Sequence, residues 1–288
     1  MFLATLILNG FVLGSILLLA SLGLTLIYGV GRVVNFAHGA LFSLGAMAAI
    51  WFTAIGFSYW GALLLTLITV GVLGVAIDWT LLARIRNRQM VDSLLLTFGI
   101  ALLITGVLYE SGGRDIHVLL PPEFLSGTAS VFGIPLPEYR LFVMVFSIAL
   151  TLILLIVLKK TRWGLRVRAA NDNAEMAACL SIDRDALMRS VVGVSAALVA
   201  IAGAAAAPIF NAYAIVGNKI LILAFMTVIL GGLGSLKGAI VAAFIVGMVI
   251  VFGEAYSGGQ GGLLILFILV MAMLLWWPRG FFGEGREE

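Results

Sequence analysis

The sequence has 288 residues, of which 62% are hydrophobic and 11% are charged, and its mean hydropathy is +1.18. These values exclude an ordinary soluble domain and predict one polytopic membrane domain, residues 1–288, whose core is a bundle of transmembrane helices. The net charge of +3 says little about partners, because the basic residues are concentrated in a few loops. Clustered basic residues in a membrane protein report orientation first, so we expect no nucleic-acid partner. Two histidines and the single Cys179 argue against a protein-only zinc site and exclude an intrachain disulfide.

Long apolar runs follow one another along the chain and predict an all-α fold of eight or nine membrane spans, including broken helices. A span needs about 20 residues, so the short run before the glycine-rich stretch 231–235 indicates a half-helix or a tilted partial span. The apolar runs cover residues 3–30, 36–56, 60–83, 93–109, 141–158, 190–210, 220–231, 238–256 and 262–277.

Three groups of basic residues indicate which ends of the spans face the cytoplasm. The first group, Arg84, Arg86 and Arg88, follows the third run. The second group lies in the long loop 159–189, and the third, Arg279 and Arg286, follows the last run. We therefore expect the N-terminus outside and the C-terminus in the cytoplasm, which requires 220–256 to cross twice. The connection 110–140 holds four of the six prolines and is expected to be an ordered external loop with extended pieces. The first 31 residues contain no Lys or Arg, so we expect no cleavable signal peptide.

Polar residues and glycines interrupt the apolar sequence at 29–39, where Asn35, His38 and Gly39 stand. Polar groups at membrane depth usually face a cavity or the bundle interior, and broken helices often line a transport path. The alternative is that Asn35 and His38 only satisfy backbone groups freed at the helix break.

A second glycine-rich stretch contains Gly231, Gly232 and Gly234 and ends in Lys237-Gly238. It fails the phosphate-loop pattern, because no Gly precedes Lys237 and no Ser or Thr follows it. The glycines are better suited to a helix break with close packing, so no ATPase site is encoded.

Two acids stand at the ends of predicted spans, and local ion pairs are their expected role. Asp78 lies six residues before Arg84, near the predicted cytoplasmic interface, and Glu254 lies near the outer end of its span. The membrane part offers no chain of ionisable residues for a proton relay and no Ser-His-Asp or metal constellation for catalysis. Energy for transport is therefore expected from outside the chain, through the charged loop.

The loop 159–189 carries seven of the seventeen Lys and Arg residues and four of the fourteen acids. Burying eleven charges in a bilayer would cost about 30 kcal/mol, so the loop lies in water. Asp172 is expected to N-cap a short helix with Glu175 as its capping-box partner, and Asp183 to cap the next helix. Met176 and Leu180 then share one face. The loop is either a docking surface or a solvated positive-inside connection.

Three motifs, in the same order and nearly end to end, resemble the ABC-importer permeases for branched-chain amino acids of the LivH type. They are Gly23–Gly29 with Arg32–Ala40 and Leu44–Ala46, then Thr161–Ala169 with Ala177–Asp183, then Val228–Ala239. Ser181 stands where that family more often has Gly. Close relatives in the family move urea, short amides or aromatic compounds, and these motifs do not separate the solutes.

The resemblance implies a multi-pass permease of the bacterial cytoplasmic membrane, without a cofactor and without catalysis of its own. It implies membrane lipid, a LivM-like second permease, two ABC ATPase subunits and an extracytoplasmic solute-binding protein as partners. The ATPase-coupling residues would be Asn171, Asp172, Glu175, Met176, Ala177, Ala178 and Leu180. The translocation path would be formed by Asn35, His38, Gly39, Gly231, Gly232 and Gly234. A stand-alone secondary carrier or channel is the second hypothesis, and an intramembrane enzyme is the third.

Overall fold

The protein is mostly helical, as the apolar runs predict. The computed structural model describes residues 2–86, 88–131, 133–278 and 280–282. Within these residues, seven helices are long and apolar enough to cross a membrane, and two apolar helices of 16 residues are shorter. The membrane helices are α1 (Phe2–Gly31), α2 (Ala37–Ala54), α3 (Tyr59–Ile77), α5 (Met90–Leu108), α6 (Glu138–Lys160), α9 (Arg184–Phe210), α10 (Val216–Gly231), α11 (Leu236–Ser257) and α12 (Gly261–Trp276). The predicted all-α membrane bundle is confirmed.

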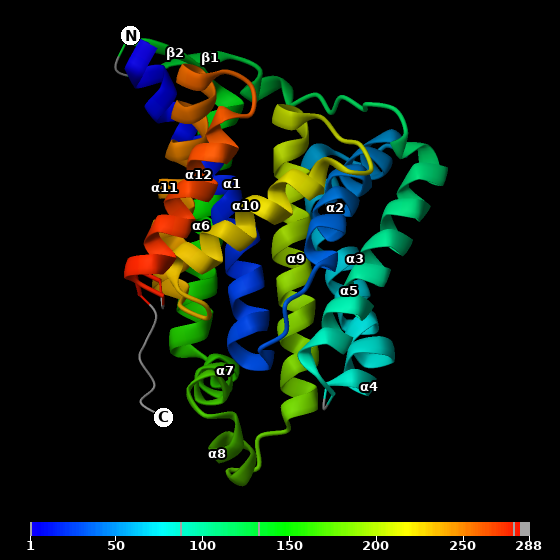
Figure 1. The fold of residues 1–288 in the computed structure, drawn as a ribbon. Coiled ribbons are helices and arrows are strands. Elements are labelled where there is room, and N and C mark those ends of the chain that lie inside the picture. Colours follow the sequence, from blue (N-terminus) through cyan, green and yellow to red (C-terminus); the bar gives the residue numbers. More distant parts are fainter. Residues whose placement is uncertain (1, 87, 132, 279, 283–288) are drawn as a thin grey trace.

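Short elements join these helices at the two ends of the bundle. The π-helix η1 (Asp78–Leu82) and α4 (Ala83–Ile85) extend α3, and η2 (Tyr109–Gly113) extends α5. The 3-10 helix η3 (Glu123–Leu125) and the strands β1 (Thr128–Val131) and β2 (Ile134–Pro137) precede α6. The helices α7 (Arg162–Asp172) and α8 (Ala174–Cys179) lie at the end of the bundle opposite the β1–β2 hairpin (Figure 1). We call these the α8 end and the hairpin end.

The helix α9 is the centre of the bundle. It packs against α1, α2 and α3, and most of its length is buried. Its alanines at 204–207 are at most 1% exposed, and their small side chains let the neighbouring helices approach closely. Tyr139 of α6 donates a hydrogen bond to the Ala205 carbonyl oxygen at 2.6 Å, and the Tyr59 hydroxyl of α3 lies 2.6 Å from the Tyr139 hydroxyl. Three helices are thereby joined near the hairpin end of α9.

The run predicted at 220–231 forms α10, which is too short to span a membrane upright. It crosses the bundle obliquely in Figure 1, and α11 then returns toward the hairpin end. The chain reverses at residues 232–235, where Ser235 caps α11 by accepting a hydrogen bond from the Gly238 N–H at 3.2 Å. The helix α10 is short and tilted, as expected of a half-helix or partial span, and the two crossings of 220–256 stay a prediction.

The connection 110–140 is ordered and contains the extended pieces predicted for it. The two strands pair antiparallel, with Thr128 opposite Pro137 and Val131 opposite Ile134. An isolated bridge between His117 and Ala212 ties the connection to the segment after α9. Its external location stays a prediction, as does the orientation of the termini. Arg279 and Arg286, which support that orientation, lie outside the described residues.

Candidate functional site

Polar side chains define the boundaries of the helices in the charged loop. Thr161 caps α7 by accepting a hydrogen bond from the Gly164 N–H at 3.1 Å. Asn173 caps α8 and accepts from the N–H groups of Glu175 (3.1 Å) and Met176 (3.0 Å). Asp183 caps α9 and accepts from Asp185 (2.9 Å) and Ala186 (3.1 Å), so this predicted helix start is confirmed.

The predicted cap at Asp172 is wrong by one residue. Asp172 is the last residue of α7, and Asn173 takes the extended conformation (φ −152°, ψ 103°) that an N-cap requires. One extended residue therefore ends α7 and begins α8. Glu175 then stands at the second position of α8, where its backbone N–H is capped, instead of at the third position of a capping box.

The short helix α8 exposes apolar side chains to the solvent. Met176 is 60% exposed and Leu180, which follows the helix, is 70% exposed, whereas Ala177 is 4% exposed and holds the helix on the protein. Glu175, Ala178 and Cys179 are also exposed. We call Glu175, Met176, Ala178 and Leu180 the α8 patch. Exposed apolar residues on a helix that projects from the bundle are suited to a partner surface.

The turn after α8 explains why glycine suits position 181. The Ile182 N–H donates to the Ala177 carbonyl at 3.2 Å, and the Ser181 N–H donates to the Ala178 carbonyl at 3.0 Å. These two bonds form a Schellman motif, which needs a left-handed residue at its centre. Ser181 has φ +61°, so it occupies a conformation that glycine adopts without steric cost.

Asn171 lies on the inner side of the loop, against both glycine-rich breaks. A Cβ atom on Gly29 would lie 2.5 Å from the Asn171 Oδ1 atom, and one on Gly234 would lie 3.6 Å from it. The same Cβ atom on Gly234 would also lie 3.5 Å from the Gly29 Cα atom. The last turn of α7 thus contacts the end of α1 and the 232–235 turn at one point.

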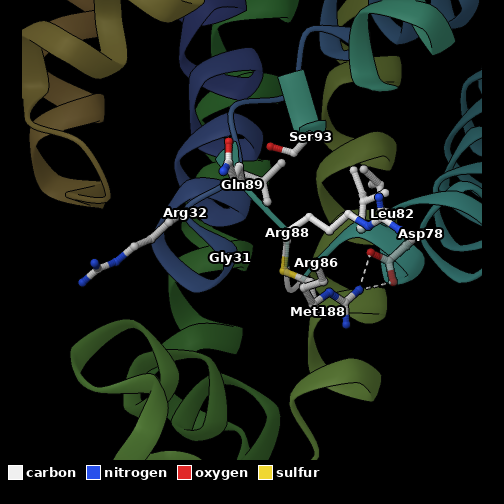
Figure 2. A pocket seen from close by; sticks show the side chains of 11 residues that line it. Gly31, Arg32, Asp78, Leu82, Arg86, Arg88, Gln89, Ser93 and Met188 are labelled. Carbon is white, nitrogen blue, oxygen red and sulfur yellow. Dashed lines mark hydrogen bonds and ion pairs between the residues drawn. The ribbon is translucent and has the colours of Figure 1, made fainter. Parts of the chain in front are cut away.

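On the other side of α8, an ion pair ties α9 to the α3–α5 connection. Arg86 donates two hydrogen bonds of 2.7 Å to the two carboxylate oxygens of Asp78 (Figure 2). The other terminal nitrogen of Arg86 binds the Asp185 carboxylate. The Asp78 side chain is 0% exposed and that of Arg86 is 5% exposed. The structural ion pair predicted for Asp78 is confirmed, with Arg86 as its partner.

The polar residues of the first break bond to backbone groups of the chain, but the Nδ1 atom of His38 is buried without a hydrogen-bond partner among the described residues. Asn35 accepts a hydrogen bond from the Ala37 N–H at 3.0 Å, at the start of α2. His38 Nε2 lies 2.7 Å from the Ala20 carbonyl oxygen of α1, and Nε2 carries the proton because a carbonyl only accepts. Asn35 is 4% exposed and His38 is 1% exposed. Both side chains hold α2 in place after the break.

The glycines predicted to line the path lie at close backbone contacts or in a turn. A Cβ atom on Gly39 would come within 2.8 Å of the Gly217 carbonyl oxygen, so α2 and α10 touch at their backbones. A Cβ atom on Gly231 would overlap the Gly238 backbone. Gly232 and Gly234 have φ values of +98° and +87°, which a turn built from other residues would rarely reach. These contacts agree with the helix break and close packing predicted for the second stretch.

Sequence reasoning missed the contacts that join distant segments of the site. The Phe36 N–H donates to the Thr97 hydroxyl of α5 at 3.2 Å, and the Ser195 hydroxyl of α9 donates to the Gly23 carbonyl oxygen at 2.7 Å. A hydroxyl residue in an apolar helix more often bonds its own backbone, so neither residue carried a signal in the sequence.

Glu254 makes the local contact expected of it, because Lys219 Nζ lies 2.9 Å from its carboxylate. Within the described part of the chain, no group of three or more His, Cys, Asp or Glu residues could hold a metal ion.

The chain is similar along almost its whole length to permeases of known transport systems. It is 25% identical to the high-affinity branched-chain amino acid transport system permease protein LivH of Salmonella typhimurium, over 97% of this chain and 95% of that protein. It is 24% identical to the permease protein BraD of Pseudomonas aeruginosa, over the same shares. It is 29% identical to a probable LivH of Methanocaldococcus jannaschii, over 96% of this chain and 92% of that protein. No solved structure matches it.

These similarities and the apolar helices identify a multi-pass protein of the inner membrane. It is a permease subunit of an ABC importer and carries no ATPase activity, which lies on partner chains. Since the family model matches residues 6–277, the chain belongs to the family described as the permease component of the branched-chain amino acid transport system.

Proposed function

We propose that this chain forms one half of the pathway of an importer for branched-chain amino acids. The other half is a LivM-like permease, two ABC ATPase subunits dock at the α8 end, and an extracytoplasmic binding protein delivers the amino acid at the hairpin end. The observation that carries the proposal is the end-to-end similarity to relatives named as branched-chain amino acid permeases.

The α8 patch is the proposed contact with an ATPase subunit. It is exposed and partly apolar, and it projects from the end of the bundle that carries the basic loop. Of the seven residues predicted to couple to the ATPase, Asp172 and the four patch residues face solvent, and these are the ones we propose to touch the partner. Asn171 and Ala177 face the protein and would instead position α8.

The residues predicted for the translocation path are proposed to shape it. Asn35 and His38 fix the start of α2, and Gly39 lets α10 approach α2. Gly231, Gly232 and Gly234 form the turn that Asn171 contacts. A displacement of α7 and α8 would therefore reach both breaks directly.

Charge introduced into the α8 patch tests the coupling role. We expect Met176→Arg to weaken association of the ATPase subunit and leucine uptake at least about tenfold. Charging an apolar side chain that becomes buried in the interface costs roughly 2 kcal/mol or more of binding free energy. Leu165→Arg is the matched control, because Leu165 is 60% exposed on α7 at the same end. Unchanged assembly in the Met176 variant, or an equal loss in the control, would contradict the assignment to α8.

The solute is tested with the complete transporter in proteoliposomes. Uptake of radiolabelled leucine should depend on the binding protein and on ATP, and unlabelled isoleucine and valine should compete with it. Urea, short amides and aromatic compounds serve as competitors of the other solute classes in this family. Competition by one of these classes, without competition by isoleucine or valine, would overturn the substrate assignment.

A further inference from the structure

A pocket with a basic lining lies at the α8 end, apart from the α8 patch. Its volume is about 190 Å³, and it lies between the end of α1, the α3–α5 connection and α9 (Figure 2). Its charged lining residues are Arg32, Asp78, Arg86 and Arg88. In Figure 2 the Arg88 side chain extends toward Asp78, whereas the Arg32 side chain extends away from the others, so Arg32 lies at the rim.

The lining has an excess of positive charge. Three arginines minus one aspartate leave two positive charges on the wall, and Asp185, which is bound to Arg86 but does not line the pocket, lowers the excess to one. Asp78 is already bound through both carboxylate oxygens by Arg86, and the second terminal nitrogen of Arg86 is bound to Asp185. Among the residues that the structure describes, neither Arg32 nor Arg88 forms an ion pair. The pocket therefore offers cationic groups that no acid of the described chain neutralises.

The beginning of α5 borders the same pocket, and within it the Asp92 N–H donates to the Gln89 carbonyl oxygen at 3.0 Å. Gln89 precedes the helix in an extended conformation, and its side chain makes no capping hydrogen bond. The first N–H groups of a helix lack partners inside it and carry partial positive charge. Gln89 and Ser93, which flank the first turn, both line the pocket, and Asp92 of that turn does not. Arg88, Arg32 at the rim and the first turn of a 19-residue helix thus border one cavity.

The size of the pocket suits a phosphate group. A water molecule occupies about 30 Å³ in the liquid, so about six water-sized groups would fill the cavity, which is enough for a phosphate and its ester oxygens. Trp79, next to Asp78, is 65% exposed, and exposed tryptophans of membrane proteins concentrate at the headgroup level. Arginine and a helix N-terminus both recognise phosphate.

We propose that this pocket binds a phosphate group, presented by the headgroup of an anionic phospholipid or as free phosphate. Two arms distinguish the sources, both with the full chain in complex with its partner subunits. Native mass spectrometry after reconstitution in phosphatidylglycerol or phosphatidylcholine measures retained lipid, and equilibrium dialysis with radiolabelled inorganic phosphate measures the free anion. Retention of phosphatidylglycerol or binding of inorganic phosphate would each support the pocket and name its source.

Variants in the lining assign that binding to the pocket. Arg88→Gln removes one lining charge, and we expect binding to weaken about tenfold or more, the usual effect of losing a hydrogen bond to a charged group. Arg84→Gln is the matched control, because Arg84 is exposed on the same connection and does not line the pocket. Gln89→Glu, at an exposed lining position, should weaken binding similarly by repulsion. Absence of binding in both arms, or an equal loss in the Arg84 and Arg88 variants, would overturn the proposal.

Discussion

The break at 31–36 and the helix α8 depart from the usual distribution of residues in opposite ways. At the break, the polar side chains of Asn35 and His38 are buried in an apolar bundle. At α8, the apolar side chains of Met176 and Leu180 are exposed in a charged loop. Asn35 Oδ1 and His38 Nε2 have hydrogen-bond partners within the chain, whereas Met176 and Leu180 are 60% and 70% exposed in the described part of the chain.

This difference separates positions that hold the fold from positions that await a partner. A buried polar group must find a partner during folding, because leaving it unpaired costs about 1–3 kcal/mol. Asn35 Oδ1 and His38 Nε2 have backbone partners, whereas His38 Nδ1 has none among the described residues, so the role of Asn35 and His38 in the path stays a prediction. The exposed apolar residues of α8 fit the contact with another chain that we propose for them, and α8 therefore carries the stronger functional signal.

The largest expected effect is at the buried ion pair. Arg86→Gln would leave the Asp78 carboxylate buried without its charged partner, and breaking such a pair costs roughly 3–5 kcal/mol. We expect a large loss of folded protein, measured by thermal unfolding in detergent and by size-exclusion chromatography.

Asp185→Ala is the matched variant for the ion pair. The Asp185 side chain is 67% exposed, and its removal leaves the ion pair between Arg86 and Asp78 intact. Its effect should be under about 1 kcal/mol, as for other exposed ion pairs. Equal losses in the two variants would show that the pair with Asp78 does not dominate.

A smaller effect is expected at His38. His38→Leu removes the hydrogen bond to the Ala20 carbonyl, and we expect a loss of about 1–2 kcal/mol in stability with unchanged uptake per folded molecule. Uptake normalised to folded protein is the measurement. A changed KM for leucine in a variant of wild-type stability would assign His38 to the lining of the path and would remove the contrast with α8.

The contact between Asn171 and the first break is tested at Gly29. Gly29→Ala would place a methyl group 2.5 Å from Asn171 Oδ1 and displace the end of α7. Because the obstacle is the end of one side chain, we expect the protein to fold. Uptake per folded molecule should fall severalfold, which corresponds to a change of about 1 kcal/mol in the coupling free energy. Gly99→Ala is the control, since no described atom lies within 4 Å of its Cβ position. Equal uptake in both variants would contradict the contact's role.

The smallest expected effect is a gain at the turn after α8. Ser181→Gly relieves the left-handed strain of Ser181, and we expect the α8 turn to be stabilised by about 0.5–1 kcal/mol. Slower hydrogen exchange at the Ser181 and Ile182 amides would report it, since both donate in this turn. Faster exchange would mean that the serine side chain compensates for its strain.

The sequence predicts the helices well because apolar runs of span length have few alternatives in a bilayer. It also predicts the cap at Asp183, which has no competing neighbour. The cap of α8 was misplaced because Asp172 and Asn173 are adjacent and equally suited to capping, and only the backbone torsions distinguish them. The partner of Asp78 was open for a similar reason, because Arg84, Arg86 and Arg88 are all within reach in the sequence. Contacts such as Asn171 with Gly29 join residues far apart in the chain, and no local pattern encodes them.

The continuity of α9 has a mechanical consequence. The helix begins three residues after Leu180 with the Asp183 cap, and it runs without a break past Ala205, where Tyr139 and, through it, Tyr59 are attached. Its 27 residues make a rod about 40 Å long. A tilt of about 5° around one end would move the other by roughly 3.5 Å, a displacement comparable with the shifts seen between states of other proteins. α9 would then act as a lever, converting a small rotation under the ATPase into a change of aperture at the far side of the membrane.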